Sequence, residues 1–417
     1  MLHAFGYLRF IHKTTCVGLA ALAWTSQVVM AQSATDLGKQ PQVSYQLSAD
    51  LWHLKTNTGA DLRPGFVEQS TNLLLPNSAT QWRYKDVSAA GWVTANKKIS
   101  NDVDLSFKAR ADQTIGTRIE QAQVQKDISP FLGVRAGIVD YKTSWCRTYE
   151  QDNGWIREID AMCNTPQFRD VTGGAPGFQI YASKPFRDFL VQGQLGVYDP
   201  LLLGYAPKEF GNLIPSPQFE VQSNKKYGFN INAVNLYTGL EARLSFIHTF
   251  QTAFSPEPLL LGQTKQESDL IYLGLNAPLS PRITGRITHT QQTQKATCRS
   301  TVALIGSRCN SNLTGSKSSS SAEVAFRLNS TDHISTGISR TTLDNQQQLF
   351  SPKADIVWQA FPTTVDSQQI SIAWRRDWGK GVFTVLQHMR SKQHLSYENF
   401  PLATQGHATG LRLGYRF

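Results

Sequence analysis

Residues 410–417 read Gly-Leu-Arg-Leu-Gly-Tyr-Arg-Phe, and this stretch decides the fold more than any other part of the 417-residue chain. Its side chains separate into two kinds with a period of two: Leu411, Leu413, Tyr415 and Phe417 against Arg412 and Arg416. Successive side chains of a β-strand point to opposite faces. The stretch therefore predicts a strand with one apolar face, which ends in an aromatic residue, and one basic face.

The same period of two recurs in residues 103–111, 189–198, 240–246 and 322–329. In residues 103–111, for example, valine, leucine, phenylalanine and alanine alternate with aspartate, serine, lysine and arginine. Antiparallel sheets of soluble proteins alternate in this way as well. The pattern thus predicts an all-β protein, and other features must show what surrounds its apolar face.

The N-terminal segment has the features of an export signal. A basic start and a short apolar stretch at 17–24 precede Val29 and Ala31, small residues at the −3 and −1 positions of a cleavage site. We expect residues 1–31 to be a signal peptide and residues 32–417 to form the mature protein. An anchor helix is the alternative, but the apolar stretch is short for a helix that spans a bilayer.

The composition limits the class of protein further. The formal net charge is +10, but the basic residues are spread along the chain without runs interleaved with aromatics, which disfavours a nucleic-acid partner. Beyond the signal segment no stretch approaches 18 consecutive apolar residues, so we expect no transmembrane helix. A mean hydropathy of −0.31 suits a barrel with a polar lumen as well as it suits a soluble protein.

The four cysteines of the expected mature chain form two local pairs. Export to an oxidising compartment favours disulfides between Cys146 and Cys163 and between Cys298 and Cys309. A metal site is the weaker alternative, because neither pair has C-x-x-C spacing and no histidine stands beside it at ligand spacing. We expect no metal and no cofactor.

Candidate strands are separated by connections that are alternately long and short. The strands are expected at 43–54, 86–97, 102–112, 119–127, 131–141, 177–184, 187–198, 226–236, 239–250, 268–277, 281–292, 320–329, 332–341, 368–377, 381–391 and 408–417. The long connections are expected at 55–85, 113–118, 142–176, 199–225, 251–267, 293–319, 342–367 and 392–407, and the short ones near 98–101, 128–130, 185–186, 237–238, 278–280, 330–331 and 378–380.

Short periplasmic turns and long extracellular loops are the layout of outer-membrane barrels. A sandwich or a propeller gives no reason for every second connection to be long. Aromatic residues near the expected periplasmic ends, among them Tyr237, Trp374 and Trp378, agree with an interfacial girdle. We therefore predict a transmembrane antiparallel β-barrel of about 16 strands, with 14 and 18 as alternatives.

Two segments leave the strand count open. Residues 353–361 alternate and could hold a further strand, whereas residues 119–127 alternate poorly and residues 332–341 are polar. The serine run at 316–321 is expected to be the end of a loop.

The terminal run 410–417 resembles the C-terminal strand by which the assembly machinery of the bacterial outer membrane recognises its clients. With the export signal and the hairpin rhythm, the whole chain resembles a Gram-negative porin of the sixteen-stranded, trimer-forming type. The resemblance implies an outer-membrane location, contact with outer-membrane lipid and lipopolysaccharide, a homotrimer, and a third extracellular loop, 142–176, that folds inward. It implies passive diffusion of small hydrophilic solutes through a water-filled channel.

Strand phase assigns charged residues to the lumen. The pore-lining candidates are Lys108, Arg110, Arg135, Glu241, Arg243, Arg286, Glu323, Arg327, Arg375 and Arg412, and the constriction-loop candidates are Glu150, Asp152, Arg157, Glu158 and Asp160. An excess of positive charge in a narrow conduit concentrates anions, so we predict an anion preference. The alternative is that many of these arginines pair with carboxylates of the lumen.

Other functions stay open at this stage. Aromatic residues in the third loop, Trp145, Trp155 and Phe168, would suit a substrate-specific channel, and stapled loops would suit a scaffold or adhesin barrel. An outer-membrane hydrolase is the least favoured, because His248 and His388 have no evident serine and acid partners in register. The chain also has no G-x-S-x-G or H-E-x-x-H motif, so we expect no catalytic residues and no enzyme.

Overall fold

The protein was analysed as a computed structural model, which describes residues 42–58, 87–112, 116–139, 175–199, 220–255, 262–300, 311–351, 354–397 and 400–416. The signal peptide expected at 1–31 and most of the third loop expected at 142–176 lie outside these residues. Within the described ranges, no helix is long and apolar enough to cross a membrane.

Sixteen strands make up the described chain, the number expected from the sequence. They are β1 (Gln42–Thr58), β2 (Val87–Lys98), β3 (Val103–Asp112), β4 (Gly116–Ser129), β5 (Leu132–Val139), β6 (Ala175–Phe186), β7 (Phe189–Tyr198), β8 (Glu220–Asn235), β9 (Glu241–Ser255), β10 (Gly262–Ser280), β11 (Ile283–Ser300), β12 (Ser311–Arg327), β13 (Asp332–Ser351), β14 (Ala354–Gly379), β15 (Val382–Tyr397) and β16 (Phe400–Arg416).

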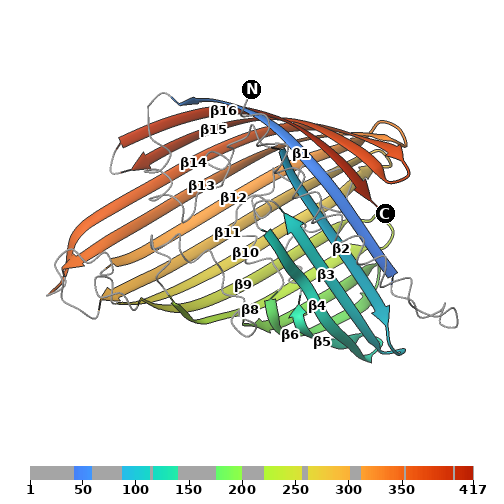
Figure 1. Ribbon diagram of the computed structural model, residues 1–417, viewed down its shortest axis with the longest axis horizontal. Helices are drawn as coiled ribbons and strands as arrows, with labels where there is room; N and C mark the ends of the chain where they lie inside the picture. Colours follow the sequence, from blue (N-terminus) through green and yellow to red (C-terminus); the bar gives the residue numbers. More distant parts are fainter. Residues whose placement is uncertain are drawn as a thin grey trace, which may run out of the picture.

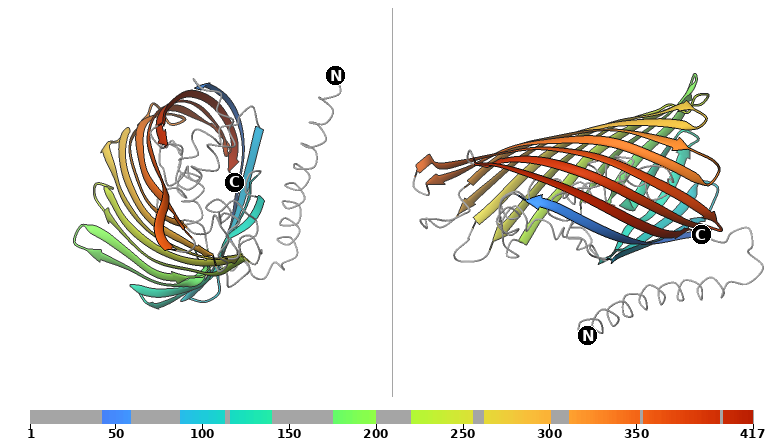
Figure 2. Two further views of the ribbon diagram at one scale, coloured as in Figure 1. Left: turned by 90° about the vertical axis from the view of Figure 1, so that its left-hand side faces the viewer. Right: turned by 90° about the horizontal axis from the view of Figure 1, so that it is seen from above.

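Each strand pairs with its sequence neighbours, and β1 pairs with β16, so that the sheet closes into a barrel. All pairings are antiparallel, and the closing one runs from Gln46 opposite Arg416 to Thr58 opposite Thr404. Figure 1 shows β1 lying between β2 and β16, and Figure 2 shows the strands curling into a ring. Closure leaves no sheet edge with unpaired backbone N–H and C=O groups, which would find no hydrogen-bond partner in the bilayer core.

The strands continue well beyond the expected boundaries at the end away from the short turns. The loops expected at 342–367 and 392–407 are wrong, because β13 ends at Ser351 and β14 begins at Ala354, while β15 ends at Tyr397 and β16 begins at Phe400. The serine run 316–321 is likewise part of β12 rather than a loop end. Residues 353–361, which alternate and could have held a further strand, lie largely in β14 and add none. In β12 and β13 the extensions are mainly polar on both faces, so they carry little period-two hydrophobic signal.

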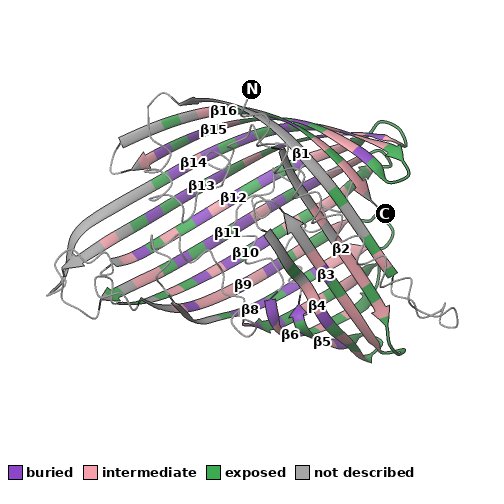
Figure 3. Ribbon diagram, viewed as in Figure 1, coloured by how far each residue is buried: buried purple, intermediate pink, exposed green. Residues whose placement is uncertain are grey.

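The two faces of the sheet differ in chemistry and in exposure, as β14 illustrates. Ile370 and Ile372 are 58% and 51% exposed, whereas Gln369 and Ser371 between and beside them are 6% and 1% exposed. The alternation of buried and exposed positions runs along most strands from β8 to β15 (Figure 3). An exposed apolar face belongs on the outside of a transmembrane barrel, so the buried polar face is the inner wall.

The short turns are held by local hydrogen bonds. In the turn before β3, the Ser100 hydroxyl donates to Asp102 Oδ1 (2.7 Å), and this bond lowers the pKa of the Asp102 carboxyl. In the turn between β14 and β15, Gly379 and Gly381 have φ of 82° and 80°, values that glycine adopts without strain. These turns fix the end of the barrel that we take as periplasmic.

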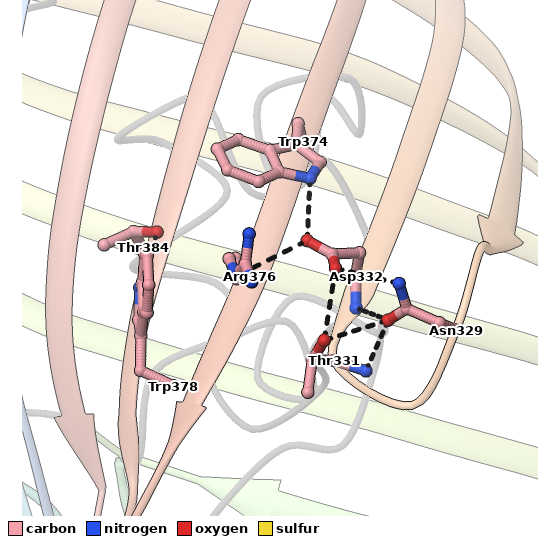
Figure 4. A network of polar contacts seen from close by, with 7 residues as sticks. All are labelled: Asn329, Thr331, Asp332, Trp374, Arg376, Trp378 and Thr384. Atoms are coloured by element: carbon pink, nitrogen blue, oxygen red, sulfur yellow. Dashed lines mark hydrogen bonds and ion pairs between the residues drawn. The ribbon is translucent and has the colours of Figure 1, made fainter.

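Two indoles mark the outer rim at this end (Figure 4). Trp374 Nε1 donates to Asp332 Oδ1 (3.1 Å), and Trp378 Nε1 donates to Thr384 Oγ1 (3.1 Å). Asp332 also accepts from Thr331 Oγ1 (3.1 Å) and Asn329 Nδ2 (3.0 Å) of the turn before β13. Indoles with an apolar body and a satisfied N–H suit the membrane–water interface.

Candidate pore wall

The inner wall carries most of the residues expected to line the pore. Those with described side chains that follow the inward phase are Lys108, Arg135, Glu241, Arg243, Arg286, Glu323, Arg375 and Arg412. Arg327 has the inward phase but is exposed at the last position of β12, next to a short turn. The side chains of Arg110 and Cys298 are not described, and Cys146, Cys163, Cys309 and the constriction-loop candidates lie outside the described residues.

A first arginine stack stands on β5 and β6. Gly133 is opposite Tyr181 across the strand pair, and a methyl group at Gly133 would come within 2.1 Å of the Tyr181 hydroxyl oxygen. The tyrosine ring therefore lies over the glycine. The Arg135 guanidinium is 4.1 Å from the ring centroid, and its Nε donates to Gln125 Oε1 (2.8 Å). The Tyr181 hydroxyl donates to Asp127 Oδ1, so the ring is fixed at both ends.

A second arginine stack stands on β14, β15 and β16. Phe383 is opposite Gly414, and a methyl group at Gly414 would come within 2.0 Å of the ring. The Arg375 guanidinium is 4.1 Å from the Phe383 ring centroid. Arg375 Nη2 also donates to Asp377 Oδ1 (2.8 Å). In both stacks an aromatic ring fills the space above a glycine and also contacts an arginine guanidinium.

Other arginines of the wall stand beside carboxylates. Arg243 Nη2 is 3.1 Å from Glu241 Oε1, and Arg286 is opposite Glu323 in the β11–β12 register. All of these residues lie near the ends of their strands that the short turns join. The wall therefore has a charged tier at its periplasmic end, where positive and negative groups are close together.

Beyond this tier the wall becomes mainly uncharged. Amides and hydroxyls bond across the strands: Gln292 Nε2 donates to Ser268 Oγ (3.0 Å), and Ser319 Oγ and Thr341 Oγ1 are 2.9 Å apart. Lysines replace arginines here, namely Lys108, Lys226 and Lys317, and a few apolar side chains such as Tyr272 are also buried in the wall.

Several amide oxygens of the wall accept no hydrogen bond from the part of the chain that the structure describes. Asn232 Oδ1, Asn276 Oδ1, Gln292 Oε1 and Asn345 Oδ1 are buried and have no partner among the described residues. Buried polar groups of native proteins are bonded to protein or to ordered water. These oxygens can therefore still accept a hydrogen bond from an ordered water or from a group beyond the described residues.

Sequence reasoning missed part of the wall. Tyr181, Phe383 and Asp127, which fix the two arginine stacks, were not among the candidates, nor were Lys226 and Lys317. Strand phase could have found Lys226, whereas Lys317 lies in the segment 293–319 that was expected to be a connection and belongs to β12 instead. The aromatic residues acquire their role from the glycine that faces them in the neighbouring strand, which requires the register.

The outer face carries histidines above its apolar residues. His248 Nδ1 is 2.8 Å from Asp269 Oδ1, so the expectation that this histidine has no acid partner in register is wrong. His289 Nδ1 is 2.8 Å from Ser320 Oγ, and His388 Nδ1 is 2.9 Å from Thr409 Oγ1. Among the described residues, no group of three or more His, Cys, Asp and Glu side chains could hold a metal ion.

No protein-family model matches the sequence, and no curated protein matches it either. Solved structures are similar in fold. In-vitro folded OmpT, an outer membrane protein of Vibrio cholerae, aligns at a TM-score of 0.52 and 8% identity over 93% of this chain and all of its own length. Its trimer form aligns at 0.51 and 8% identity over 91% of this chain and 99% of its own.

The outer membrane channel DcaP of Acinetobacter baumannii aligns at a TM-score of 0.50 and 10% identity, over 93% of this chain and 100% of its own length. Identities this low establish the fold and not the activity. The fold is that of proteins of the Gram-negative outer membrane, the location expected from the sequence. The chain thus has the fold of these outer-membrane proteins, a closed antiparallel barrel of sixteen strands.

Proposed function

We propose that this protein is a porin, a water-filled channel for passive diffusion of small hydrophilic solutes across the outer membrane. The observation that carries the proposal is the chemistry of the inner wall: amide, hydroxyl and charged side chains face the lumen of a closed barrel of sixteen strands, while the apolar side chains face outward. Sixteen strands spaced about 4.8 Å apart and tilted about 40° give a backbone diameter of about 30 Å, too wide for wall side chains alone to fill.

Single-channel recording in planar bilayers tests the proposal. The purified barrel should produce discrete, voltage-independent conductance steps in KCl, because a hydrated bore conducts ions without a gate. A scaffold or adhesin barrel would produce none. A barrel that folds correctly, as shown by its heat-modifiable electrophoretic mobility, yet gives no steps would contradict the porin function.

The same recording bears on the third loop. If residues 142–176 narrow the bore and the Cys146–Cys163 disulfide holds them in place, a reductant should change the step size. Cys146→Ser, with and without reductant, should give the step size that the unsubstituted protein shows under reductant, because the disulfide can no longer form. A Cys298→Ser variant is the matched control and should keep the oxidised step size.

We further propose that the channel prefers anions over cations. The inner carboxylates stand beside arginines, as in Arg243–Glu241 and Arg375–Asp377, while lysines add positive charge farther along the wall. A conduit with excess positive charge concentrates anions. Reversal potentials in a tenfold KCl gradient should have the sign of chloride permeation, and cation selectivity would contradict this part.

A homotrimer is the expected assembly. The OmpT relative was solved in a trimer form, and this chain has short strands on one side, with only 8 residues in β5 and 10 in β3. Small residues such as Ala95 and Ala109 have the outward phase there, which favours close approach of two walls. Light scattering should give three chains per particle, and Ala109→Arg should lower that number.

A hydrolase is the second candidate, because His289 and Ser320 form a hydrogen-bonded pair on the outer wall. A serine nucleophile requires such a base. No third side chain among the described residues is seen to orient His289 by a hydrogen bond, as an efficient triad requires. Phospholipase activity that Ser320→Ala abolishes and Ser318→Ala keeps would establish this candidate; no activity is expected.

A further inference from the structure

Near the short turns, the inner wall differs in exposure between two groups of strands. Ser106 and Ser335 are both the fourth residue of a strand that leaves a short turn, on β3 and β13. Ser106 is partly exposed, whereas Ser335 is 3% exposed. Gln194 and Gln387 are both the sixth residue of such a strand, on β7 and β15. Gln194 is partly exposed and Gln387 is 5% exposed, so like residues at like distances from the turns have different surroundings.

The same contrast holds along the neighbouring strands. Among the described side chains of β2, β3 and β4, only Lys108 and Gln123 are buried. Along β13, β14 and β15, buried residues recur at most alternate positions (Figure 3). We call the inner face of β3 to β7 that comprises Ser106, Gln125, Ser183 and Gln194 the open sector, and that of β13 to β15 that comprises Ser335, Ser371 and Gln387 the closed sector.

Side chains of the closed sector bond to one another. Gln387 Nε2 donates to Ser371 Oγ (3.1 Å) and to Met389 Sδ (2.9 Å), and Gln369 Nε2 donates to the same sulfur (3.3 Å). Ser371 and Met389 are each 1% exposed. This part of the inner wall is therefore a packed layer whose polar groups bind each other rather than a solute.

The open sector lies beside strands that carry little side-chain bulk on their inner face. Four inward positions of β5 to β7 are glycines, namely Gly133, Gly137, Gly177 and Gly196. Gly137 is exposed and has a φ of 118°. A methyl group there would also come within 2.3 Å of the backbone oxygen of Ala122, so only glycine fits. The missing side chains leave room beside this part of the wall.

Polar groups of three kinds face this room. The Arg135 guanidinium lies 4.1 Å from the Tyr181 ring centroid, and its Nε donates to Gln125 Oε1 (2.8 Å). Tyr181 is opposite Gln194 across the β6–β7 pair. Arg135 is partly exposed, whereas Arg375 of the second stack is 9% exposed. A cation, amides and hydroxyls thus line the open sector.

We propose that solutes cross the periplasmic end of the lumen off the barrel axis, along the open sector, and that small hydroxylated acids are the solutes it favours. Hydroxyls and amides, as of Ser106 and Gln194, bond to the hydroxyl groups of such a solute. The Arg135 guanidinium attracts its acid group, because hydrogen bonds between charged groups are stronger than neutral ones. This inference rests on the proposed channel function and specifies its route.

Thiol labelling of the whole folded barrel in planar bilayers tests the route. Each variant carries one added cysteine: Ser106→Cys and Gln194→Cys in the open sector, with Ser335→Cys and Gln387→Cys as controls. The controls match in residue type and in distance from the turn. Heat-modifiable electrophoretic mobility verifies folding. Mass spectrometry counts labels beyond those that the unsubstituted protein takes up through its own cysteines.

An anionic and a cationic reagent should act with opposite signs in the open sector. Sulfonatoethyl methanethiosulfonate should lower the chloride-to-potassium permeability ratio about twofold, the effect of one charge about 10 Å from the passing ion in water. Trimethylammonioethyl methanethiosulfonate should raise the ratio by a similar factor. Both should lower the conductance step, because the label occupies part of the route. The closed-sector variants should take up no label and keep both values.

Liposome swelling tests the class of solute. The entry rate of gluconate relative to glucose should fall about twofold in Arg135→Gln, which removes one charge about 10 Å from the route. The control is Arg327→Gln, which removes an exposed inward arginine on β12, outside the open sector. It should leave the ratio nearly unchanged, because charges farther away than about 10 Å are largely screened by salt.

Equal labelling and equal conductance changes in the two sectors would overturn the route, because solutes would then pass along the axis. Labels in the open sector that change neither the step nor the permeability ratio would overturn it as well. An equal fall of the gluconate ratio in Arg135→Gln and Arg327→Gln, or no fall in either, would reject the solute class. In all of these outcomes conductance steps persist, whereas failure of the channel function itself would appear as their absence in the unsubstituted protein.

Discussion

In both arginine stacks of the inner wall an aromatic ring covers a strand glycine, but the carboxylate of each stack bonds to a different partner. On β5 and β6 a tyrosine lies over Gly133, its hydroxyl donates to Asp127, and the arginine takes an amide partner, Gln125. On β14 to β16 a phenylalanine lies over Gly414, and the carboxylate bonds to the arginine instead. Glycine, ring and arginine are therefore the common unit, and the acidic residue is an anchor that can attach to either partner.

The two stacks also differ in the group to which the carboxylate bonds. Each stack contains one arginine and one carboxylate, and in the second stack Asp377 bonds directly to the guanidinium of Arg375. At the first stack the carboxylate bonds to the ring hydroxyl, and Arg135 Nε bonds to a neutral amide. In the first stack the carboxylate thus fixes the ring, whereas in the second it fixes the guanidinium itself.

The largest expected effect is on stability, from filling the glycine positions. Gly133→Ala should destabilise the barrel by about 3 kcal/mol and Gly414→Ala by about 1–2 kcal/mol, within the usual range for overpacking. The first is costlier because its added methyl would also meet a backbone oxygen, Lys126 O at 2.7 Å, whereas Gly414 faces only a side chain at such distances. Urea unfolding in lipid vesicles, followed by tryptophan fluorescence, measures both.

Gly193→Ala is the control for this series. A methyl group at this strand position would meet nothing within 4 Å, so its stability should match that of the unsubstituted protein. Equal losses at all three positions would mean that the general cost of replacing strand glycines, rather than the aromatic rings above them, sets the stability.

An intermediate effect should follow from removing the tyrosine anchor. Tyr181→Phe keeps the ring over Gly133 and makes the first stack resemble the second, but it deletes the bond to Asp127. Loss of a hydrogen bond to a charged group should lower the free energy of unfolding by about 1.5–3 kcal/mol. Phe383→Leu at the other stack is the comparison, and an unchanged stability in Tyr181→Phe would show that the hydroxyl is not an anchor.

The smallest effects should appear in ion selectivity, with opposite signs. Asp377→Asn should raise the chloride-to-potassium permeability ratio, and Arg135→Gln should lower it, each by about twofold, because one charge about 10 Å away in water contributes about 0.4 kcal/mol. Reversal potentials at low ionic strength, where screening is weak, measure the change. Shifts of the same sign in both variants would contradict the role assigned to the wall charges.

The sequence predicted the barrel well where one face meets lipid. Strands such as β3 and β7 were located within a few residues, because greasy and polar side chains must alternate there. It failed on the upper parts of β12 to β16, where Ser316 to Ser321 and residues 342–367 were assigned to loops. Above the membrane both faces are wet, and backbone pairing alone keeps the strands extended.

The sequence also predicted only part of the candidate pore wall. Phase alone placed Arg135, Arg243, Arg286 and Arg375 on the polar face, because side-chain direction follows from residue parity once a strand is recognised. Phase could not reveal that Arg135 and Arg375 rest on aromatic rings. That contact joins residues far apart in the sequence and depends on which glycine stands opposite which ring.

By itself, then, the sequence determined that this chain forms a ring of paired strands with a greasy exterior and a polar interior, since the alternation of side chains is a local property. Tertiary structure decided the full strand lengths, the closing register of β1 with β16, and the placement of Tyr181 and Phe383 over glycines and beside arginines. These depend on cross-strand register, which arises only when strands distant in the chain come together and every backbone group must find a partner.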